Sequence, residues 1–511
     1  MFKKLLNHYT GLLGAIIVMA SAPVAGDFVI SGPGQWHSVP DVAFDGTNYL
    51  VVWRNYRSDN YDIYGQFVNT AGTLVGDNFP VATSAKDENH PAIVWDGTKY
   101  FVSYSDDNYW PVNIDGRFVS ASGTVSDSFE ISDYTTEDHL YSAVAFDGTN
   151  YLVVWKDYRN GGSVWTADIY GQMMDTSGAR IGTNFAISTA EKRQTRPAVA
   201  FDGRNYLVVW EDYRKAPEPP PYMDSANIYG QRVNLSGGLE GDEVEISIAE
   251  KNQVNPAIAF DGTNYLVVWQ DGRNISTSDF DIYSQRIDTA GNLIGDNFAI
   301  STANSAQIFP AIVFDGMNYL VVWSDRRNTT NGNIYAQRVD VSGNLVDTNF
   351  AISRSFDGQF YPAVTSDGNK CLVVWYGNEP NDSIYGNIDT QVGIEEKEKS
   401  DPELDSGRSP KSEICIYPNP FSTTTAIKLS GYQAIKSNNP IARLLDSSVA
   451  LEIYDLSGRL VRSFTINHQL STINQMVWDG RDSYGNEVKS GIYFCELKVN
   501  GTETKKLIVI R

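Results

Sequence analysis

A unit of four short apolar runs repeats along most of the chain. An Asp-Gly pair separates the first two runs of each unit and recurs at intervals of 51 to 59 residues, at Asp45, Asp96, Asp147, Asp202, Asp261, Asp315 and Asp367. In the fullest copy the four runs are PAIAF, YLVVW, IYSQRID and NFAIS. Short runs rich in Val, Ile, Tyr and Trp between turn residues predict strands. Each unit therefore predicts one antiparallel sheet of four strands.

Seven such sheets predict a seven-bladed β-propeller, because one small sheet cannot bury both of its faces and radial packing covers them. The seventh copy lacks its fourth run, whereas an isolated FVIS run at residues 28–31 precedes the first copy. This run starts 17 residues before Asp45, and the other fourth runs start 17 or 18 residues before their Asp-Gly pair. We therefore predict that residues 28–31 complete the last blade and close the ring. The propeller is expected to span residues 27–392.

The two ends of the chain differ from the repeat. Residues 1–26 combine two lysines, a short apolar stretch and a run of small residues, which is the layout of a signal peptide. Residues 393–412 are highly charged and contain Pro, Gly and Ser, as linkers do. Residues 413–511 contain six or seven strand-like runs and predict a small β-sandwich. The whole chain is thus predicted to be all-β.

Motifs in the last fifth of the chain resemble a known family. They are YPNPF from Tyr417, LEIYDLSGRLV from Leu451, VWDGRDSYGNEVKSGIYFCEL from Val477 and the terminal KKLIVIR. These motifs resemble the type A C-terminal sorting domain of type IX secretion cargo, which is similar to the immunoglobulin-like domain of flagellar hook-capping proteins. The expanded segment at residues 431–448 departs from the short turn usual in that family. The resemblance implies passage through the periplasm, contact with the export machinery, and release at or attachment to the outer cell surface.

Composition narrows the classes of partner. The chain has 62 acidic and 40 basic residues and a net charge of −22, which argues against binding of nucleic acid. Three cysteines cannot form a disulfide framework, and no zinc-binding spacing or calcium-loop pattern occurs. Cys415 and Cys495 could form one disulfide or remain two buried thiols. We expect no metal, no cofactor and no transmembrane segment in the mature chain.

One recurring motif contains residues that could be catalytic. Trp-x-Asp-x-Arg occurs in four copies, for example at Trp155, Asp157 and Arg159. Paired carboxylates can hydrolyse glycosides, but a catalytic group is needed only once, so the repetition favours an Asp–Arg bond that braces a loop. The sequence contains no nucleophile elbow, zinc-protease motif or phosphate-binding loop. We expect no enzyme activity; the alternative is an extracellular glycoside hydrolase or another hydrolytic propeller enzyme.

Two ring positions precede each Asp-Gly pair, at the end of the blades where the loops vary in length. The residue eight positions before the pair is always polar: His37, Glu88, His139, Gln194, Gln253, Gln307 and Gln359. We favour side-chain bonds to the backbone between successive blades for this ring. The residues six positions before the pair share no chemistry: Val39, His90, Tyr141, Arg196, Asn255, Phe309 and Tyr361. They form the candidate ligand-binding rim, mixed aromatic and polar around a channel mouth.

The sequence as a whole favours an exported or cell-surface protein. We expect a binding or structural role in which the propeller rim engages a protein or a glycan, while the C-terminal domain directs secretion and surface sorting. The Asp-Gly turns are nearly identical in every copy, so the face that carries them is expected to be structural. The variable loops include a Pro-rich one at residues 215–224 and are expected at the rim.

Overall fold

A computed structural model of the chain describes residues 26–32, 36–57, 60–107, 111–133, 137–160, 166–217, 225–275, 279–327, 331–353, 358–378, 382–389, 413–417, 425–430, 449–455, 459–466, 475–478, 481–483, 486, 488, 491–499 and 501–509. The predicted signal peptide and linker, and residues 218–224 of the Pro-rich loop, lie outside this part. The chain divides into two compact units, Met1–Glu396 and Lys397–Arg511, each described by itself.

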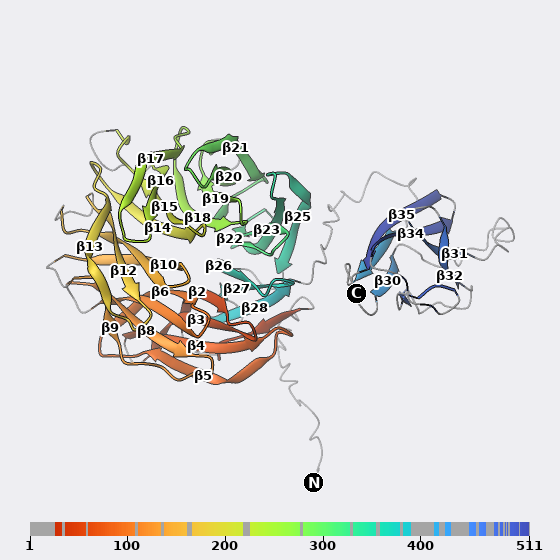
Figure 1. The fold of residues 1–511 in the computed structure, drawn as a ribbon, viewed down its shortest axis with the longest axis horizontal. Helices are drawn as coiled ribbons and strands as arrows, with labels where there is room; N and C mark the ends of the chain where they lie inside the picture. Colours follow the sequence, from red (N-terminus) through yellow and green to blue (C-terminus); the bar gives the residue numbers. More distant parts are fainter. Residues whose placement is uncertain are drawn as a thin grey trace, which may run out of the picture. The chain divides into compact units, whose positions relative to one another are not determined.

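The first unit contains seven antiparallel sheets of four strands each, arranged around a common centre (Figure 1). Blades 1 to 3 comprise β2 (His37–Phe44), β3 (Asn48–Arg57), β4 (Asn60–Asn69) and β5 (Leu74–Ala82); β6 (Asp87–Trp95), β7 (Lys99–Asp107), β8 (Asn113–Ser120) and β9 (Phe129–Glu130); and β10 (His139–Phe146), β11 (Asn150–Asp157), β12 (Asp168–Asp175) and β13 (Arg180–Ser188). Blades 4 to 6 comprise β14 (Gln194–Phe201), β15 (Asn205–Asp212), β16 (Asn227–Asn234) and β17 (Leu239–Ser247); β18 (Gln253–Phe260), β19 (Asn264–Asp271), β20 (Asp281–Asp288) and β21 (Leu293–Ser301); and β22 (Gln307–Phe314), β23 (Asn318–Asp325), β24 (Asn333–Asp340) and β25 (Leu345–Ser353). Blade 7 comprises β26 (Gln359–Ser366), β27 (Cys371–Gly377), β28 (Ser383–Asp389) and β1 (Asp27–Val29). The predicted seven-bladed propeller is confirmed.

The YLVVW run at the centre of the second strand is apolar on both faces because neighbouring blades cover both of them. In β3, Leu50 and Val52 pack into a cluster with residues of blade 2, whereas Val51 and Trp53 pack into a cluster with residues of blade 7. Successive side chains of a strand point to opposite faces, so both sets must be apolar. The recurring YLVVW run is therefore the sequence signature of a sheet packed between two others.

The N-terminal strand closes the ring. β1 pairs with β28, with Phe28 opposite Gly386, and the innermost strands β2 and β26 of the first and last blades contact each other. Beyond β1, Ile30 N donates to Ile384 O at 2.8 Å, and Ile384 N donates to the hydroxyl of Ser31 at 2.8 Å. The predicted completion of the seventh blade by residues 28–31 is confirmed.

The Asp-Gly turns lie at one end of the blades and are built alike. In the first, Asp45 Oδ1 accepts bonds from the backbone N–H groups of Thr47 and Asn48 at 2.7 and 2.6 Å, and Gly46 has a φ of 92°, which glycine adopts without strain. The hydroxyl of Tyr100 in blade 2 donates to Asn48 O at 3.0 Å. These turns therefore tie blades together, in agreement with a structural role for this face.

The described part of the second unit forms two antiparallel sheets. One contains β29 (Glu413–Tyr417), β30 (Thr425–Ser430) and β33 (Gln475–Trp478), and the other contains β31 (Val449–Asp455), β32 (Leu460–Ile466), β34 (Gly491–Val499) and β35 (Gly501–Val509). Ile453, Val461 and Trp478 are buried in this unit. Cys371 is buried in blade 7, and the side chains of Cys415 and Cys495 lie outside the described residues.

Candidate functional site

A β-bulge interrupts the innermost strand of every blade at the same place. In blade 1, Ser38 pairs with Arg54 and Asp41 with Val52, so two residues oppose the single Trp53. The first bulge residue of each blade has a φ between 49° and 57°; these residues are Val39, His90, Tyr141, Arg196, Asn255, Phe309 and Tyr361. They are the seven residues of the predicted rim.

This backbone conformation is unfavourable for most of the residues that adopt it. A positive φ suits glycine and asparagine, and of the seven only Asn255 is of that kind. Val39 is β-branched and therefore the least suited. In six of the seven blades a proline follows the rim residue. Proline has no N–H to donate to a neighbouring strand, and a sheet tolerates it at a bulge because the ladder of hydrogen bonds is interrupted there. Such strained positions are held by the surrounding structure and cluster at functional sites.

All seven rim residues line one hollow between the innermost strands. Its volume is about 400 Å³, within the range of small-molecule sites. The rings of His90 and Tyr141 meet edge to face with centroids 4.5 Å apart, and those of Phe309 and Tyr361 lie 4.3 Å apart. The structure thus brings the whole predicted rim together around a single space.

Two arginines place positive charge at this hollow. Arg196 donates through Nη1 to Asn255 Oδ1 at 2.8 Å, and its guanidinium carbon lies 5.1 Å from the centre of the Tyr141 ring. Arg54 lines the hollow from blade 1. Burial, reinforced by Arg54 and Arg196, lowers the pKa of His90 to about 4. The imidazole is therefore neutral near pH 7, and the charge of the hollow comes from the two guanidinium groups.

A supporting layer lies one residue after the recurrent Trp of the blades, which is Tyr104 in blade 2. Glu211 Oε1 accepts a bond from Asn255 N at 2.8 Å, and Gln270 Oε1 accepts bonds from Asn255 Nδ2 at 2.9 Å and Phe309 N at 3.4 Å. Burial raises the pKa of Glu211, against the opposing influence of Arg196. Sequence analysis missed this position, although the repeats show that its residue type varies from blade to blade. The residues at this position are Arg54, Ser105, Lys156, Glu211, Gln270, Ser324 and Tyr376.

The polar ring eight residues before each Asp-Gly pair is buried and holds the segment that enters each blade. The glutamines of blades 4 to 6 donate to carbonyl oxygens of that segment. Gln359 Oε1 accepts a bond from Ile334 N of the preceding blade at 2.9 Å, and His37 Nδ1 lies 2.7 Å from Asp382 O of blade 7. These contacts confirm the predicted side-chain bonds to the backbone in blades 1 and 4 to 7, whereas His139 of blade 3 contacts the side chains of Ser132 and Asp157.

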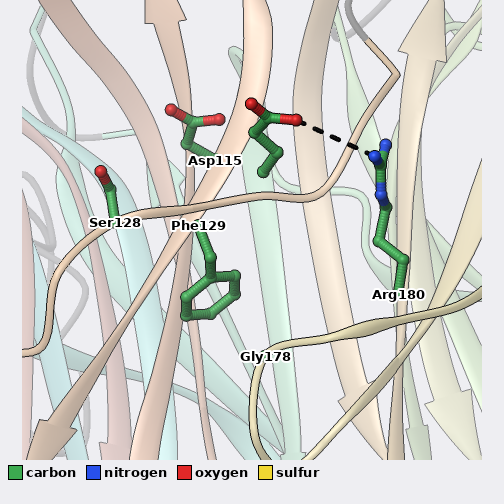
Figure 2. A pocket seen from close by; sticks show the side chains of 6 residues that line it. Asp115, Ser128, Phe129, Gly178 and Arg180 are labelled. Carbon is green, nitrogen blue, oxygen red and sulfur yellow. Dashed lines mark ion pairs between the residues drawn. The ribbon is translucent and has the colours of Figure 1, made fainter.

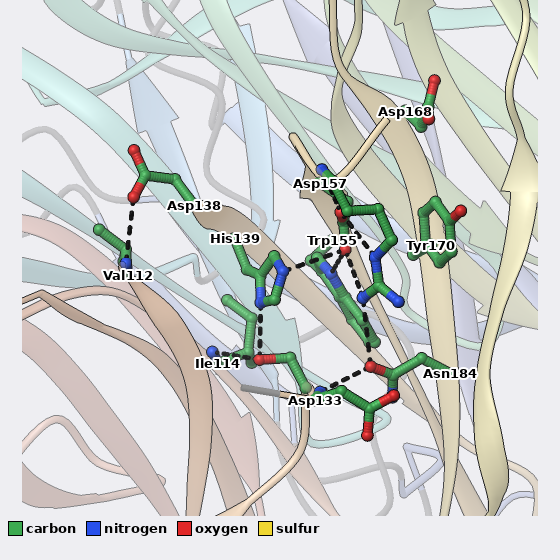
Figure 3. Close-up of polar contacts among 12 residues, drawn as sticks. Val112, Ile114, Asp133, Asp138, His139, Trp155, Asp157, Asp168, Tyr170 and Asn184 are labelled. Carbon is green, nitrogen blue, oxygen red and sulfur yellow. Dashed lines mark hydrogen bonds and ion pairs between the residues drawn. The ribbon is translucent and has the colours of Figure 1, made fainter. Parts of the chain in front are cut away.

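The Trp-x-Asp-x-Arg motif forms a buried brace, shown for blade 3 in Figure 3. Asp157 Oδ2 accepts a bond from Trp155 Nε1 at 2.8 Å, and Arg159 donates to both carboxylate oxygens at 2.9 and 2.7 Å. The Arg159 guanidinium lies 4.2 Å from the centre of the Tyr170 ring. The same contacts recur in blades 4 to 6. The predicted Asp–Arg bond at this loop is confirmed.

A serine, a histidine and an aspartate come together beside this brace. His139 Nδ1 lies 2.9 Å from the hydroxyl of Ser132, and His139 Nε2 lies 3.3 Å from Asp157 Oδ2 (Figure 3). All three side chains are buried, and Ser132 Oγ also accepts a bond from Ile114 N. Burial lowers the pKa of His139, and a neutral ring protonated at Nε2 satisfies both contacts. We interpret the group as a structural link between blades 2 and 3, because all three side chains are shielded from solvent and bonded to one another.

Blade 2 departs from the repeat and borders a second hollow, of about 440 Å³ (Figure 2). Its lining residues are Asp115, Ser128, Phe129, Glu130, Gly178 and Arg180. Asp115 stands where the other six blades have Tyr, and strand β9 has only two residues. Burial, followed by the charge of Asp106, raises the pKa of Asp115 to about 7. Sequence analysis did not single out this site, although the replaced Tyr was visible in the repeat.

Asp115→Asn is expected to stabilise the propeller at neutral and alkaline pH. The folded-state pKa lies above the ordinary value of 3.8, so ionisation between about pH 4 and pH 7 favours the unfolded chain and lowers stability as the pH rises. The variant escapes this loss and should gain roughly 2 to 4 kcal/mol in free energy of unfolding at pH 8, with little gain at pH 4. Urea denaturation at both pH values measures the difference. Asp127→Asn, an exposed change in the same blade, should show no such dependence, and an equal gain for Asp115→Asn at both pH values would contradict the assignment.

The described residues were also compared with the requirements of a metal site and of a membrane-spanning helix. None of their His, Cys, Asp and Glu side chains gather in a group of three or more that could hold a metal ion. They also include no helix that is long and apolar enough to cross a membrane.

Comparison with known proteins identifies the domain at the C-terminal end of the chain. Residues 415–511 match the family model described as a secretion system C-terminal sorting domain. The chain ends in a secretion sorting domain. The resemblance to type IX secretion cargo is thereby confirmed, and the sorting domain directs the protein to the cell surface or the extracellular space. None of the curated proteins compared with the chain matches it.

Several solved structures are similar to the chain at low identity. A puromycin-hydrolysing peptidase of Mycobacterium tuberculosis is 12% identical, with a TM-score of 0.46, over 78% of this chain and 61% of the peptidase. The NanB sialidase of Streptococcus pneumoniae is 12% identical, with a TM-score of 0.42, over 71% of this chain and 70% of the sialidase. The β-propeller domain of the Trilobed protease from Pyrococcus furiosus is 12% identical, with a TM-score of 0.41, over 70% of this chain and 94% of the protease domain. The chain thus spans less than two thirds of the mycobacterial peptidase, and the named activities are those of the other proteins.

Proposed function

We propose that this exported protein is a binding protein and not an enzyme, and that its ligand, a glycan or a protein, enters the hollow lined by the rim residues. The observation that carries the proposal is the ring itself. One backbone position with a strained φ is repeated in all seven blades, and the side chains at that position, of six different residue types, face one space of about 400 Å³. A scaffold role would be served equally well by one residue type, as it is at the Asp-Gly turns.

The carboxylates near the hollow favour binding over hydrolysis. The residues that line the hollow include no Asp or Glu. Asp41 and Glu211 lie close by. Glu211 is buried and Asp41 is partly buried, and both already accept bonds from backbone N–H groups, Asp41 from Ile93 and Val42 at 3.0 and 2.9 Å. Hydrolysis of a glycoside by the usual mechanism requires two carboxyl groups that flank the scissile bond, and this hollow offers none.

Single rim substitutions should weaken a ligand without unfolding the protein. The full chain is screened on a glycan array and by pull-down from extracellular protein, and the captured ligand is titrated by calorimetry. Tyr141→Ala, Arg196→Ala and Tyr361→Ala should each cost about 1 to 3 kcal/mol of binding free energy, the range of anchor residues. Their melting temperatures should change little, because these side chains border open space.

Thr263→Ala is the matched control for these variants, since Thr263 is exposed on an Asp-Gly turn at the opposite end of the blades. It should bind as the parent protein does. Loss of binding in the Thr263 variant together with normal binding by the rim variants would show that the other face carries recognition.

A further inference from the structure

We propose that the hollow selects a glycan that bears carboxylate groups, with the guanidinium groups of Arg54 and Arg196 as the receptors for the carboxylate. This inference rests on the proposed binding function and names the class of ligand. It starts from a contrast of charge: the whole chain carries −22, yet the residues that line the hollow include two arginines and no carboxylate.

Arg196 has donor capacity to spare. Its Nη1 donates to Asn255 Oδ1 at 2.8 Å, and its Nε lies 3.5 Å from Glu211 Oε1. A guanidinium group has five N–H donors, and within the described part of the chain no acceptor is found for Nη2. The side chain is 41% exposed, and its guanidinium is fixed against the ring of Tyr141. It is therefore both held in position and open to a ligand.

Arg54 is held in a similar way on the other side of His90. Its Nε donates to Ser38 Oγ and its Nη1 to Asn89 Oδ1, both at 3.0 Å, and it stacks 4.2 Å from the centre of the Tyr61 ring. Neutral side chains accept these bonds, so no described ion pair cancels the charge. Guanidinium groups bind carboxylates through two parallel hydrogen bonds, which gives both strength and orientation.

The rest of the wall suits sugar rings better than a peptide. The pairs His90 with Tyr141 and Phe309 with Tyr361 offer flat apolar surfaces to the C–H faces of a sugar. Asn255 and the neutral His90, which both line the hollow, can bond to hydroxyl groups. A glycan with carboxylates combines apolar ring faces, hydroxyl groups and charge, and the hollow provides a counterpart for each. Export to the cell surface or the extracellular space gives the hollow access to ligands outside the cell.

The test compares ligands that differ in the carboxylate alone, with the full chain and calorimetry at low salt. Oligogalacturonate is compared with its methyl ester, and sialyllactose with lactose; the two pairs distinguish uronic acids from sialic acids as the source of the charge. We expect at least one acidic member to bind roughly tenfold or more tightly than its neutral partner. Arg196→Gln and Arg54→Gln should each remove most of that preference, whereas Arg204→Gln, at an exposed Asp-Gly turn, should leave it intact.

Each other outcome overturns the inference in a recognisable way. Equal binding of acidic and neutral glycans, or an acid preference that survives both rim substitutions, contradicts the carboxylate site but leaves the binding function in place. Capture of a glutamate-rich peptide with no binding of acidic glycans shows that the charge serves a protein partner. Failure of every glycan and protein probe to bind contradicts the proposed function and this inference together.

Discussion

Protein from which residues 27–31 have been deleted is expected to lose on the order of 5 kcal/mol of free energy of unfolding. The deletion removes strand β1, the buried side chain of Ile30 and the bonds of Ile30 and Ser31 to Ile384. It also exposes the edge of β28. Since whole domains are stabilised by only about 5 to 15 kcal/mol, the propeller should open or aggregate well below its normal melting temperature. Thermal and urea denaturation measure the effect.

Two point substitutions separate ring closure from loss of chain length. Ile30 is buried, so Ile30→Ala should cost about 2 to 5 kcal/mol. Val29 is its neighbour but is 46% exposed, so Val29→Ala should have almost no effect. An unchanged melting temperature after deletion of residues 27–31 would refute closure by this segment.

Asp271→Ala is expected to destabilise the propeller by about 3 to 5 kcal/mol, the typical cost of breaking a buried charge pair. The Asp271 side chain is fully buried and accepts bonds from Trp269 Nε1 at 2.7 Å and from Arg273 Nε and Nη2 at 2.9 and 2.7 Å. Without it, the indole N–H loses its acceptor and the arginine keeps a charge with no counterion at that position. Urea denaturation at pH 7 gives the loss of stability.

The double variant Asp271→Ala/Arg273→Met should recover part of that loss, because it also removes the unpaired charge. Asp296→Ala, an exposed change in the same blade, is the matched control and should stay within about 0.5 kcal/mol of the parent protein. Should Asp271→Ala behave like Asp296→Ala, the brace would not contribute to stability. The repeat already contains one comparison: blades 1 and 7 lack the Asp, and there the indole N–H groups of Trp53 and Trp375 have no partner within the described part of the chain.

The architecture was predictable because it depends on sequence patterns that recur in all seven repeats. An apolar run such as YLVVW, covered on both faces, and an Asp-Gly turn after the innermost strand are local features, and their repetition implies blades. The place of residues 28–31 followed from counting residues to Asp45. Repetition also separated structure from chemistry at Asp157 and Arg159, since a brace is needed in many blades and a catalytic pair only once.

The backbone conformation of the rim residues was harder to predict from the sequence, because it results from pairing with the next strand and not from the local φ preference of each residue. Val39 and Phe309 have no tendency toward a positive φ, and only the proline that follows them marks the bulge. The contribution of Arg54 depends on register, which places the residue after Trp53 beside the rim. The second hollow depends on the short strand β9 and on Asp115, and a comparison of blade 2 with the other blades would have indicated it.

The most direct test of the account replaces the chemistry of the rim and keeps its backbone. Asparagine tolerates a positive φ, and Asn255 shows that the position accepts it. A variant with Asn at Val39, His90, Tyr141, Arg196, Phe309 and Tyr361 should retain a cooperative thermal transition and the circular dichroism of the parent protein. Its affinity for the captured ligand, measured by calorimetry on the full chain, should fall by about 100-fold or more. A folded variant that binds as tightly as the parent protein would contradict the assignment of recognition to the rim.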